Sequence, residues 1–212
     1  MEWQLPIQKV EIGNMNIGNP WARKESTQKP MAPLSYFGTH FRLPYVSLLF
    51  PPLTVIEYNI HTGKLVLDMS ETSLACIKLS TLQETLVGAI VYHQYGWFKT
   101  DFTTQEVRQG FQPIFQDNQL LLHCPLGTPP SRSRGEGGRG FGQKPPMYES
   151  GKGWRETTPE DLKPGKRLRV AVKFHGISFL NRSDQKDESS EMVWSGKCRI
   201  QHRIQGMLCM NS

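Results

Sequence analysis

Two segments of the chain, 167–174 and 196–204, alternate between basic and apolar side chains. Successive side chains of a β-strand point to opposite faces of a sheet, so each segment predicts a strand with one face in a core and the other charged. We expect the two strands to pair as a hairpin, which gathers six cations on one surface. These cations are Arg167, Arg169, Lys173, Lys197, Arg199 and Arg203.

Neither predicted strand carries an aspartate or a glutamate, and the acids of this region lie in the connecting loop NRSDQKDESSEM. Like charges that face each other across a β-ladder destabilise it, so a purely structural surface would be expected to interleave acids. A row of cations is suited to tracking phosphates, because each neutralised phosphate releases counterions. The pattern predicts a face that binds a polyanion. The alternative is a solvated face whose cations meet acids from neighbouring strands.

Proteins that bind single-stranded nucleic acid add aromatic side chains on which bases stack. Trp154 and Trp194 are candidates because their neighbours in the chain are Gly, Ser, Lys and Arg instead of apolar residues. Trp97 is a third candidate, and packing in the core is the alternative for all three. The segment SRSRGEGGRGFG resembles the RGG-type tracts that contact single strands. Its arginines join the candidate binding residues: Arg132, Arg134 and Arg139.

The run that begins with DLKPGKRLRV and ends with WSGKCRIQHRI, residues 161–204, resembles the C-terminal part of the single-stranded DNA-binding proteins of large DNA viruses. These proteins have an OB-fold. The resemblance covers about a fifth of the chain. It implies a replication protein that coats unwound strands, with DNA favoured over RNA and the six cations at the backbone groove. It also implies action at replication sites in the host cytoplasm or nucleus, and leaves open self-association along the strand.

The formal charge of +6 is unevenly distributed along the chain. Residues 1–125 hold 9 lysines and arginines with 10 aspartates and glutamates, whereas residues 126–212 hold 16 and 9. Such asymmetry indicates a nucleic acid or an anionic membrane surface as partner. The first residues lack the pattern of a signal peptide, no run approaches about 20 apolar residues, and the four cysteines show no CxxC spacing. We therefore expect a soluble intracellular protein with reduced thiols and no membrane partner.

Local patterns predict the secondary structure. A strand at 45–50 should stop at Pro51 and Pro52. Hairpins are expected at 53–69, around His-Thr-Gly, at 111–125, turning at Asp117-Asn118, and at 166–180 with 193–207. Two helices are expected, a long one at 80–93 and a short one at 104–109. The long helix should begin with a capping box at Ser80 or Thr81. Its inner face should consist of Leu82, Leu86, Ala89, Ile90 and His93.

These elements predict a mainly β fold: an antiparallel OB-like barrel or sandwich with one long packed helix and a long disordered Gly/Arg-rich loop. The expected organisation is a loosely packed N-terminal arm, residues 1–30, and a single β-rich nucleic-acid-binding domain, residues 31–212. Within that domain, residues 127–153 are expected to form a flexible insertion, because their composition buries too little apolar surface to offset the ordering entropy.

The sequence argues against catalysis. The six histidines show no HxH or HExxH pair, which makes a metal site unexpected, and GEGGRGFG lacks the Lys-Ser/Thr of a phosphate loop. No cofactor is predicted. The expected function is non-enzymatic coating of single-stranded DNA by phosphate neutralisation and base stacking. The alternatives are a structural or virion protein that docks an acidic partner, an RNA-binding protein, and a nuclease whose carboxylates come from distant segments.

Overall fold

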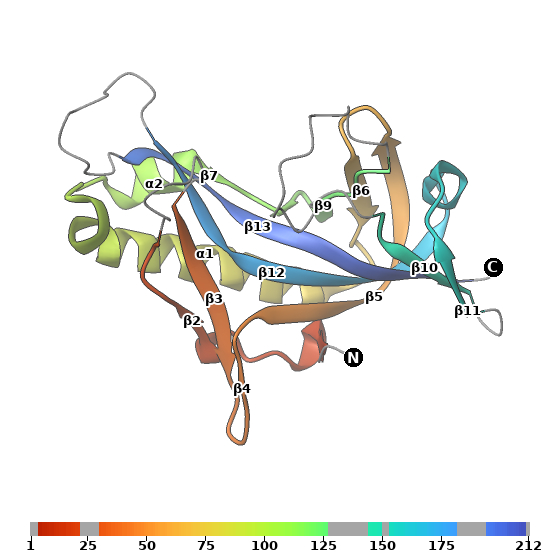
Figure 1. Ribbon diagram of the computed structural model, residues 1–212, viewed down its shortest axis with the longest axis horizontal. Coiled ribbons are helices and arrows are strands. Elements are labelled where there is room, and N and C mark those ends of the chain that lie inside the picture. Colours follow the sequence, from red (N-terminus) through yellow and green to blue (C-terminus); the bar gives the residue numbers. More distant parts are fainter. Residues whose placement is uncertain (1–3, 22–29, 127–143, 150–152, 182–193, 211–212) are drawn as a thin grey trace, which may run out of the picture.

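The computed structural model describes residues 4–21, 30–126, 144–149, 153–181 and 194–210. It is mainly β, with a large mixed sheet of 13 strands that does not close, one long helix and one short helix (Figure 1). The expectation of a mainly β fold with one long packed helix is confirmed. The expectation of a purely antiparallel sheet is wrong, because three strand pairs within the described part are parallel.

The strands of the N-terminal half are β1 (Leu5–Pro6), β2 (Met15–Ile17), β3 (Met31–Phe37), β4 (Arg42–Leu43), β5 (Val46–Asn59) and β6 (Lys64–Asp68). Those that follow the helices are β7 (Phe111–Gln112), β8 (Phe115–Gln116), β9 (Gln119–His123), β10 (Pro146–Glu149), β11 (Gly153–Glu156), β12 (Arg167–Asn181) and β13 (Trp194–Cys209). The helices are α1 (Ser73–Phe98) and α2 (Thr104–Gly110), with 3-10 turns η1 (Ile7–Lys9), η2 (Ile12–Asn14) and η3 (Pro159–Leu162).

The longest strands, β12 and β13, pair antiparallel along almost their whole lengths, as the alternating pattern predicts. One face of this ladder is apolar and buried; it includes Val170, Val172, Phe174, Ile200 and Ile204. From the ladder the sheet runs through β5, β6 and β9 on one side and through β10 and β11 on the other. The two long strands thus connect all parts of the sheet.

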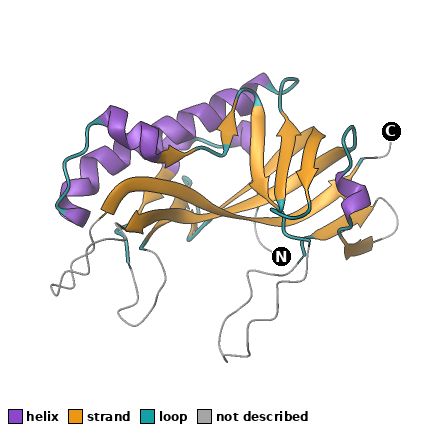
Figure 2. Cartoon of the chain, turned by 90° about the horizontal axis from the view of Figure 1, so that it is seen from above, coloured by secondary structure: helices purple, strands orange, loops and turns teal. Residues whose placement is uncertain are grey.

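Helix α1 packs on this apolar face, and Figure 2 shows both helices on one side of the sheet. Leu82, Leu86 and Ile90 are buried as predicted, whereas Ala89 and His93 are half-buried. The helix starts earlier than predicted, at Ser73, because Ala75 and Leu79 extend its buried stripe. The predicted capping box is therefore wrong. Thr81 lies inside the helix, where its hydroxyl donates to the Ile77 carbonyl at 2.8 Å.

By length and composition alone α1 would qualify as a membrane span, the one such helix among the described residues. This differs from the expectation that no segment comes close to one. In its most apolar window 39% of the helix is buried within the protein. Core helices of soluble proteins share this composition.

Two predicted turns are confirmed. The β5–β6 hairpin closes with Gly63 at a φ of 68°, and the β8–β9 hairpin turns at Asp117 and Asn118, with φ values of 51° and 58°. Positive φ at both central residues is the type I′ geometry that suits a two-residue hairpin. The short helix is also where the sequence places it, and Thr103 with Glu106 forms its capping box.

The prediction that the strand stops at Pro51 and Pro52 is wrong. Strand β5 continues through both prolines. The ladder with β12 is irregular at this point, since Arg169 pairs with Pro52 and Ala171 pairs with Leu49. Prolines lack a backbone N–H and are tolerated in a sheet where the ladder is interrupted. Strand β5 therefore remains one long strand that pairs with β12 on both sides of this irregularity.

The N-terminal region is packed over residues 5–17, so the predicted loose arm is wrong there. Strand β1 pairs parallel with β5, and β2 pairs with β3. Ile7 and Val10 are fully buried in the same core that contains Phe174 and Met207. The predicted flexible insertion is likewise wrong in its last part, since β10 pairs with β13 and β11 pairs with β10. Residues 127–143 and 150–152 lie outside the described ranges.

A charged cluster joins β10 and β11 to η3. The Arg155 guanidinium donates to both Asp161 oxygens, at 2.6 and 2.7 Å, and to Glu149 Oε1 at 2.8 Å. Asp161 also accepts from the backbone N–H and hydroxyl of Thr158. Arg155 is the main cause that lowers the pKa of Asp161 from 3.8 to about 2, and the Thr158 bonds add to this against the opposing effect of burial.

We predict that Asp161 makes stability depend on acid pH. Its pKa in the folded state lies below that in the unfolded state, so its contribution is present above about pH 4 and disappears as the pH falls towards about 2. Thermal unfolding of Asp161→Asn should show a deficit against wild type near neutral pH that shrinks across this window. Glu160→Gln, an exposed neighbour on the same turn, is the control and should change little. A deficit that does not vary with pH would contradict this prediction.

Candidate functional site

All six predicted cations lie on the face of the β12–β13 ladder that points away from α1. Directly paired residues share a face, and Lys173 pairs with Arg203. A bulge at His175 shifts the alternation in β12, so Ser178 comes to lie opposite Arg199 on the same face. We call this surface the basic face. It consists of the six cations and the residues that pair directly with them in the sheet. The cations are Arg167, Arg169, Lys173, Lys197, Arg199 and Arg203.

The cations differ in their surroundings. Arg167 lies 3.3 Å from Glu71 in an ion pair whose two side chains are more than half exposed, so this cation meets an acid from outside the hairpin, as the alternative of a solvated face expects. Such an exposed pair adds little stability. Arg169 donates through Nε to the Phe50 carbonyl at 3.3 Å. Lys197 and Arg199 are exposed and form no ion pair with the described residues.

Lys173 and Arg203 face each other directly across the ladder. Two like charges in this position lower the stability of the pair of strands, by up to about 1 kcal/mol. The Lys173 ammonium lies 3.8 Å from the centre of the Tyr45 ring, and this cation–π contact offsets part of the repulsion. The sheet thus brings two cations together on the face that carries the other four.

The register also places exposed aromatic rings on the basic face. One row across the sheet runs through Trp154, Tyr148, Leu208 and Arg169, each the direct partner of the next. The rings of Trp154 and Tyr148 are exposed, and the Tyr148 ring lies against Gly206. A flat exposed ring beside a cation is the arrangement on which an unpaired base can stack.

A second row lies further along the same face. It runs through Gln112, Arg199, Ser178, Met31 and Trp21, again by direct pairing. The Trp21 side chain is about half exposed. Each of the two rows thus contains both a cation and an exposed aromatic ring, and the opposed pair of Lys173 and Arg203 lies between the rows.

Two tryptophans expected on this surface lie elsewhere. Trp194 is 1% exposed, and its ring packs edge-on against Phe102 and Phe179 on the α1 side of the sheet. Its indole N–H donates to the Lys197 carbonyl at 2.9 Å. The prediction that Trp194 is not held by the core is therefore wrong, because the hydrophobic residues around it come from distant segments.

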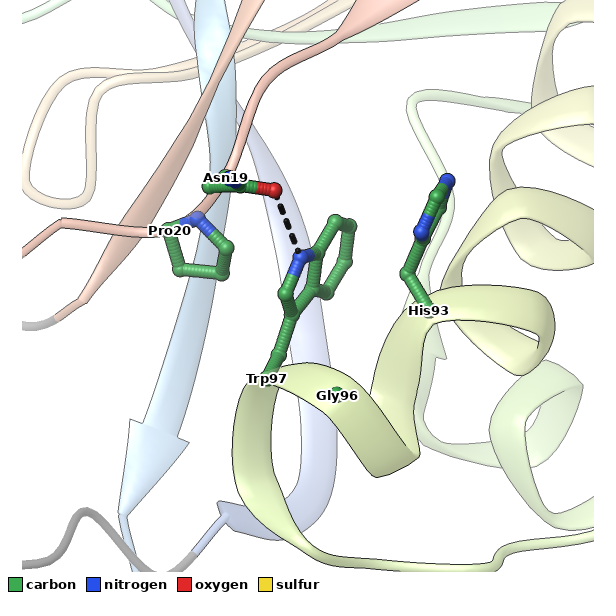
Figure 3. A pocket seen from close by; sticks show the side chains of 5 residues that line it. All are labelled: Asn19, Pro20, His93, Gly96 and Trp97. Atoms are coloured by element: carbon green, nitrogen blue, oxygen red, sulfur yellow. Dashed lines mark hydrogen bonds between the residues drawn. The ribbon is translucent and has the colours of Figure 1, made fainter.

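Trp97 is half-buried near the C-terminal end of α1, on the opposite side of the sheet from the basic face. Figure 3 shows its indole between Asn19 and His93. The indole N–H donates to the Asn19 side chain at 3.2 Å, and the His93 ring stacks on it with centroids 5.0 Å apart. The ring is thus held by partners within the protein, and the structure does not bring it together with the six cations.

Comparison of the chain with models of protein families, with curated proteins and with solved structures finds no match.

The predicted arginines Arg132, Arg134 and Arg139 lie outside the described residues. Tyr148, Tyr45 and Trp21 are on or beside the basic face and were not predicted. Trp21 stands between Pro20 and the basic run Arg23-Lys24, the same kind of local setting that singled out Trp154. Tyr148 gave no such signal, since its place depends on the pairing of β10 with β13.

Proposed function

We propose that the protein binds single-stranded nucleic acid along the basic face, without catalysis, by neutralising phosphates and stacking bases. The observation that carries the proposal is the register, which places exposed aromatic rings in line with cations on one face of one sheet. Phosphates would contact Lys197, Arg199 and the central pair of Lys173 and Arg203. Bases would stack on Trp154, Tyr148 and Trp21.

An open OB-like arrangement is part of the proposal. Five strands follow one another through the sheet in the order β13, β12, β5, β6 and β9. The first and last of these approach each other where the His123 backbone N–H on β9 donates to His202 on β13 at 2.9 Å. Five strands in a partly open barrel are characteristic of OB-folds that bind single strands. The resemblance of residues 161–204 to viral single-stranded DNA-binding proteins supports this and favours DNA over RNA, with coating of strands during replication as the role.

The gathering of cations on one face favours a polyanion as the ligand. The direct pairing of Lys173 with Arg203 brings their ammonium and guanidinium groups to one side of the ladder, where one phosphate can contact both. Aromatic rings beside the cations favour nucleic acid over an acidic protein surface, because bases stack and carboxylate side chains do not.

We predict that Lys197→Ala with Arg199→Ala weakens binding of a labelled oligo-dT. The slope of log affinity against log salt should fall by about 0.7 for each phosphate that is no longer neutralised. Fluorescence anisotropy at several salt concentrations measures both. Lys9→Ala with Lys163→Ala removes the same charge from exposed positions outside the basic face and serves as the control. Equal affinity and slope in the folded double variant and the control would contradict the assignment of the phosphate contacts.

Stacking at Trp154 should be separable from charge. We predict that Trp154→Ala lowers oligo-dT affinity by about 1–3 kcal/mol, and that the decrease persists at high salt because stacking releases no counterions. Tyr92→Ala is the control, since Tyr92 is exposed on α1 on the other side of the sheet. Full wild-type affinity for Trp154→Ala at both high and low salt would remove Trp154 from the binding surface.

A further inference from the structure

The sheet leaves a gap between β9 and β13, at the border of the basic face. The edge of β13 that faces away from β12 is paired within the described residues only at 198–199, with β7, and at 207–208, with β10. Between these points β9 approaches β13 without a ladder in the described part of the chain, and the His123 backbone N–H donates to the His202 side chain. The gap is therefore an interruption in the sheet that side chains line from both sides.

This gap holds a pocket of about 480 Å³. Its volume lies within the range of about 300–1,000 Å³ that is usual for small-molecule sites. Its walls include apolar side chains, among them Ile114, Leu121 and Ile200. Such walls suit a flat, largely apolar group, and are large enough in extent to take one nucleobase.

Two cations and several groups that form hydrogen bonds complete the pocket. Lys64 comes from the start of β6, and Arg199 comes from the basic face. The Lys64 ammonium lies 4.0 Å from Glu57 in an exposed contact, which leaves it able to meet another anion. Gln112 also lines the pocket, and an amide that both donates and accepts can pair with a base edge.

His202 is a half-buried polar group of the pocket, and its Nδ1 atom is buried. Its Nε2 accepts the His123 backbone N–H, so the proton of the neutral ring is on Nδ1, and Nδ1 is buried without an acceptor in hydrogen-bonding geometry among the described residues. Burial is the main cause that lowers the pKa of His202 to about 4; the backbone of Ile200 opposes this shift, and His123, Arg199 and His175 add to it. The ring is therefore neutral near pH 7 and adds no charge to the pocket.

We propose that this pocket binds one nucleotide of the strand, with the base between the apolar walls and the phosphate at Lys64 and Arg199. The inference rests on the proposed function and adds to it. Arg199 belongs to both the basic face and the pocket, so a strand that follows the cations reaches the pocket mouth. A single extruded base would then fill the interruption in the sheet. The ligand class is a nucleoside monophosphate unit, because the apolar walls suit a base and the two cations suit a phosphate.

Isothermal titration calorimetry with free thymidine 5′-monophosphate tests the proposal directly. Saturable binding at one site is expected, with weaker binding of thymidine and of inorganic phosphate. Lys64→Met should weaken the nucleotide by about tenfold or more, as for removal of one charged hydrogen bond, and should leave thymidine unchanged. Leu121→Trp, which fills the pocket without changing its charge, should abolish binding of both. Lys163→Met is the control for removal of an exposed cation elsewhere.

Three outcomes would overturn the proposal. Equal affinity for phosphate and nucleotide would reduce the pocket to an anion site. Undiminished nucleotide binding by folded Leu121→Trp would place the ligand elsewhere, and absence of saturable binding to wild type would leave no site. Oligo-dT binding measured on the same samples tells a failure of the nucleotide pocket from a failure of the proposed function. If oligo-dT binds and the nucleotide does not, the pocket is wrong and the proposed function stands; if the nucleotide binds and oligo-dT does not, the proposed function fails.

Discussion

The antiparallel pairing of β12 with β13 is the interaction on which the rest of the structure depends. It runs from Leu168 opposite Cys209 to Asn181 opposite Trp194, and the other strands attach to these two either directly or through further strands. Because alternation in a strand has a period of two, this register decides at once which side chains enter the core under α1 and which form the basic face. A slip by one residue would exchange the two sets.

The register also explains why the bulges matter. Without the extra residue at His175, the second half of β12 would turn Ser178 towards the core and Phe179 towards solvent. With the bulge, Phe179 joins the aromatic cluster around Trp194, and Ser178 gives Arg199 a small neighbour on the basic face. The same long strands therefore serve both the packing of the α1 side and the surface that we propose binds a strand. On that surface Lys173 and Arg203 lie directly opposite each other.

Local pattern predicted much of this arrangement. The alternation in β12 and β13 and the Asp117-Asn118 turn depend on neighbours in the chain, and both were found where expected. Of the predicted inner face of α1, Leu82, Leu86 and Ile90 are buried. The features that were missed depend on contacts between distant segments. Trp194 is buried by Phe98 and Phe102, and Ile7 lies in η1, which contacts both α1 and β5. Tyr148 reaches the basic face only because β10 adds to β13. No local composition encodes such pairings.

The central claim is that the basic face binds single strands through phosphates and bases together. The most direct measurement is a titration of wild-type protein with labelled single-stranded and double-stranded oligonucleotides of equal length at two salt concentrations, with poly-glutamate as competitor. We predict tighter binding of the single strand, an affinity that falls as salt rises, and little competition by poly-glutamate. Equal binding of both oligonucleotides would contradict the claim that the face prefers single strands. Their displacement by poly-glutamate at matched charge would also contradict the claim and would favour an acidic protein as the partner.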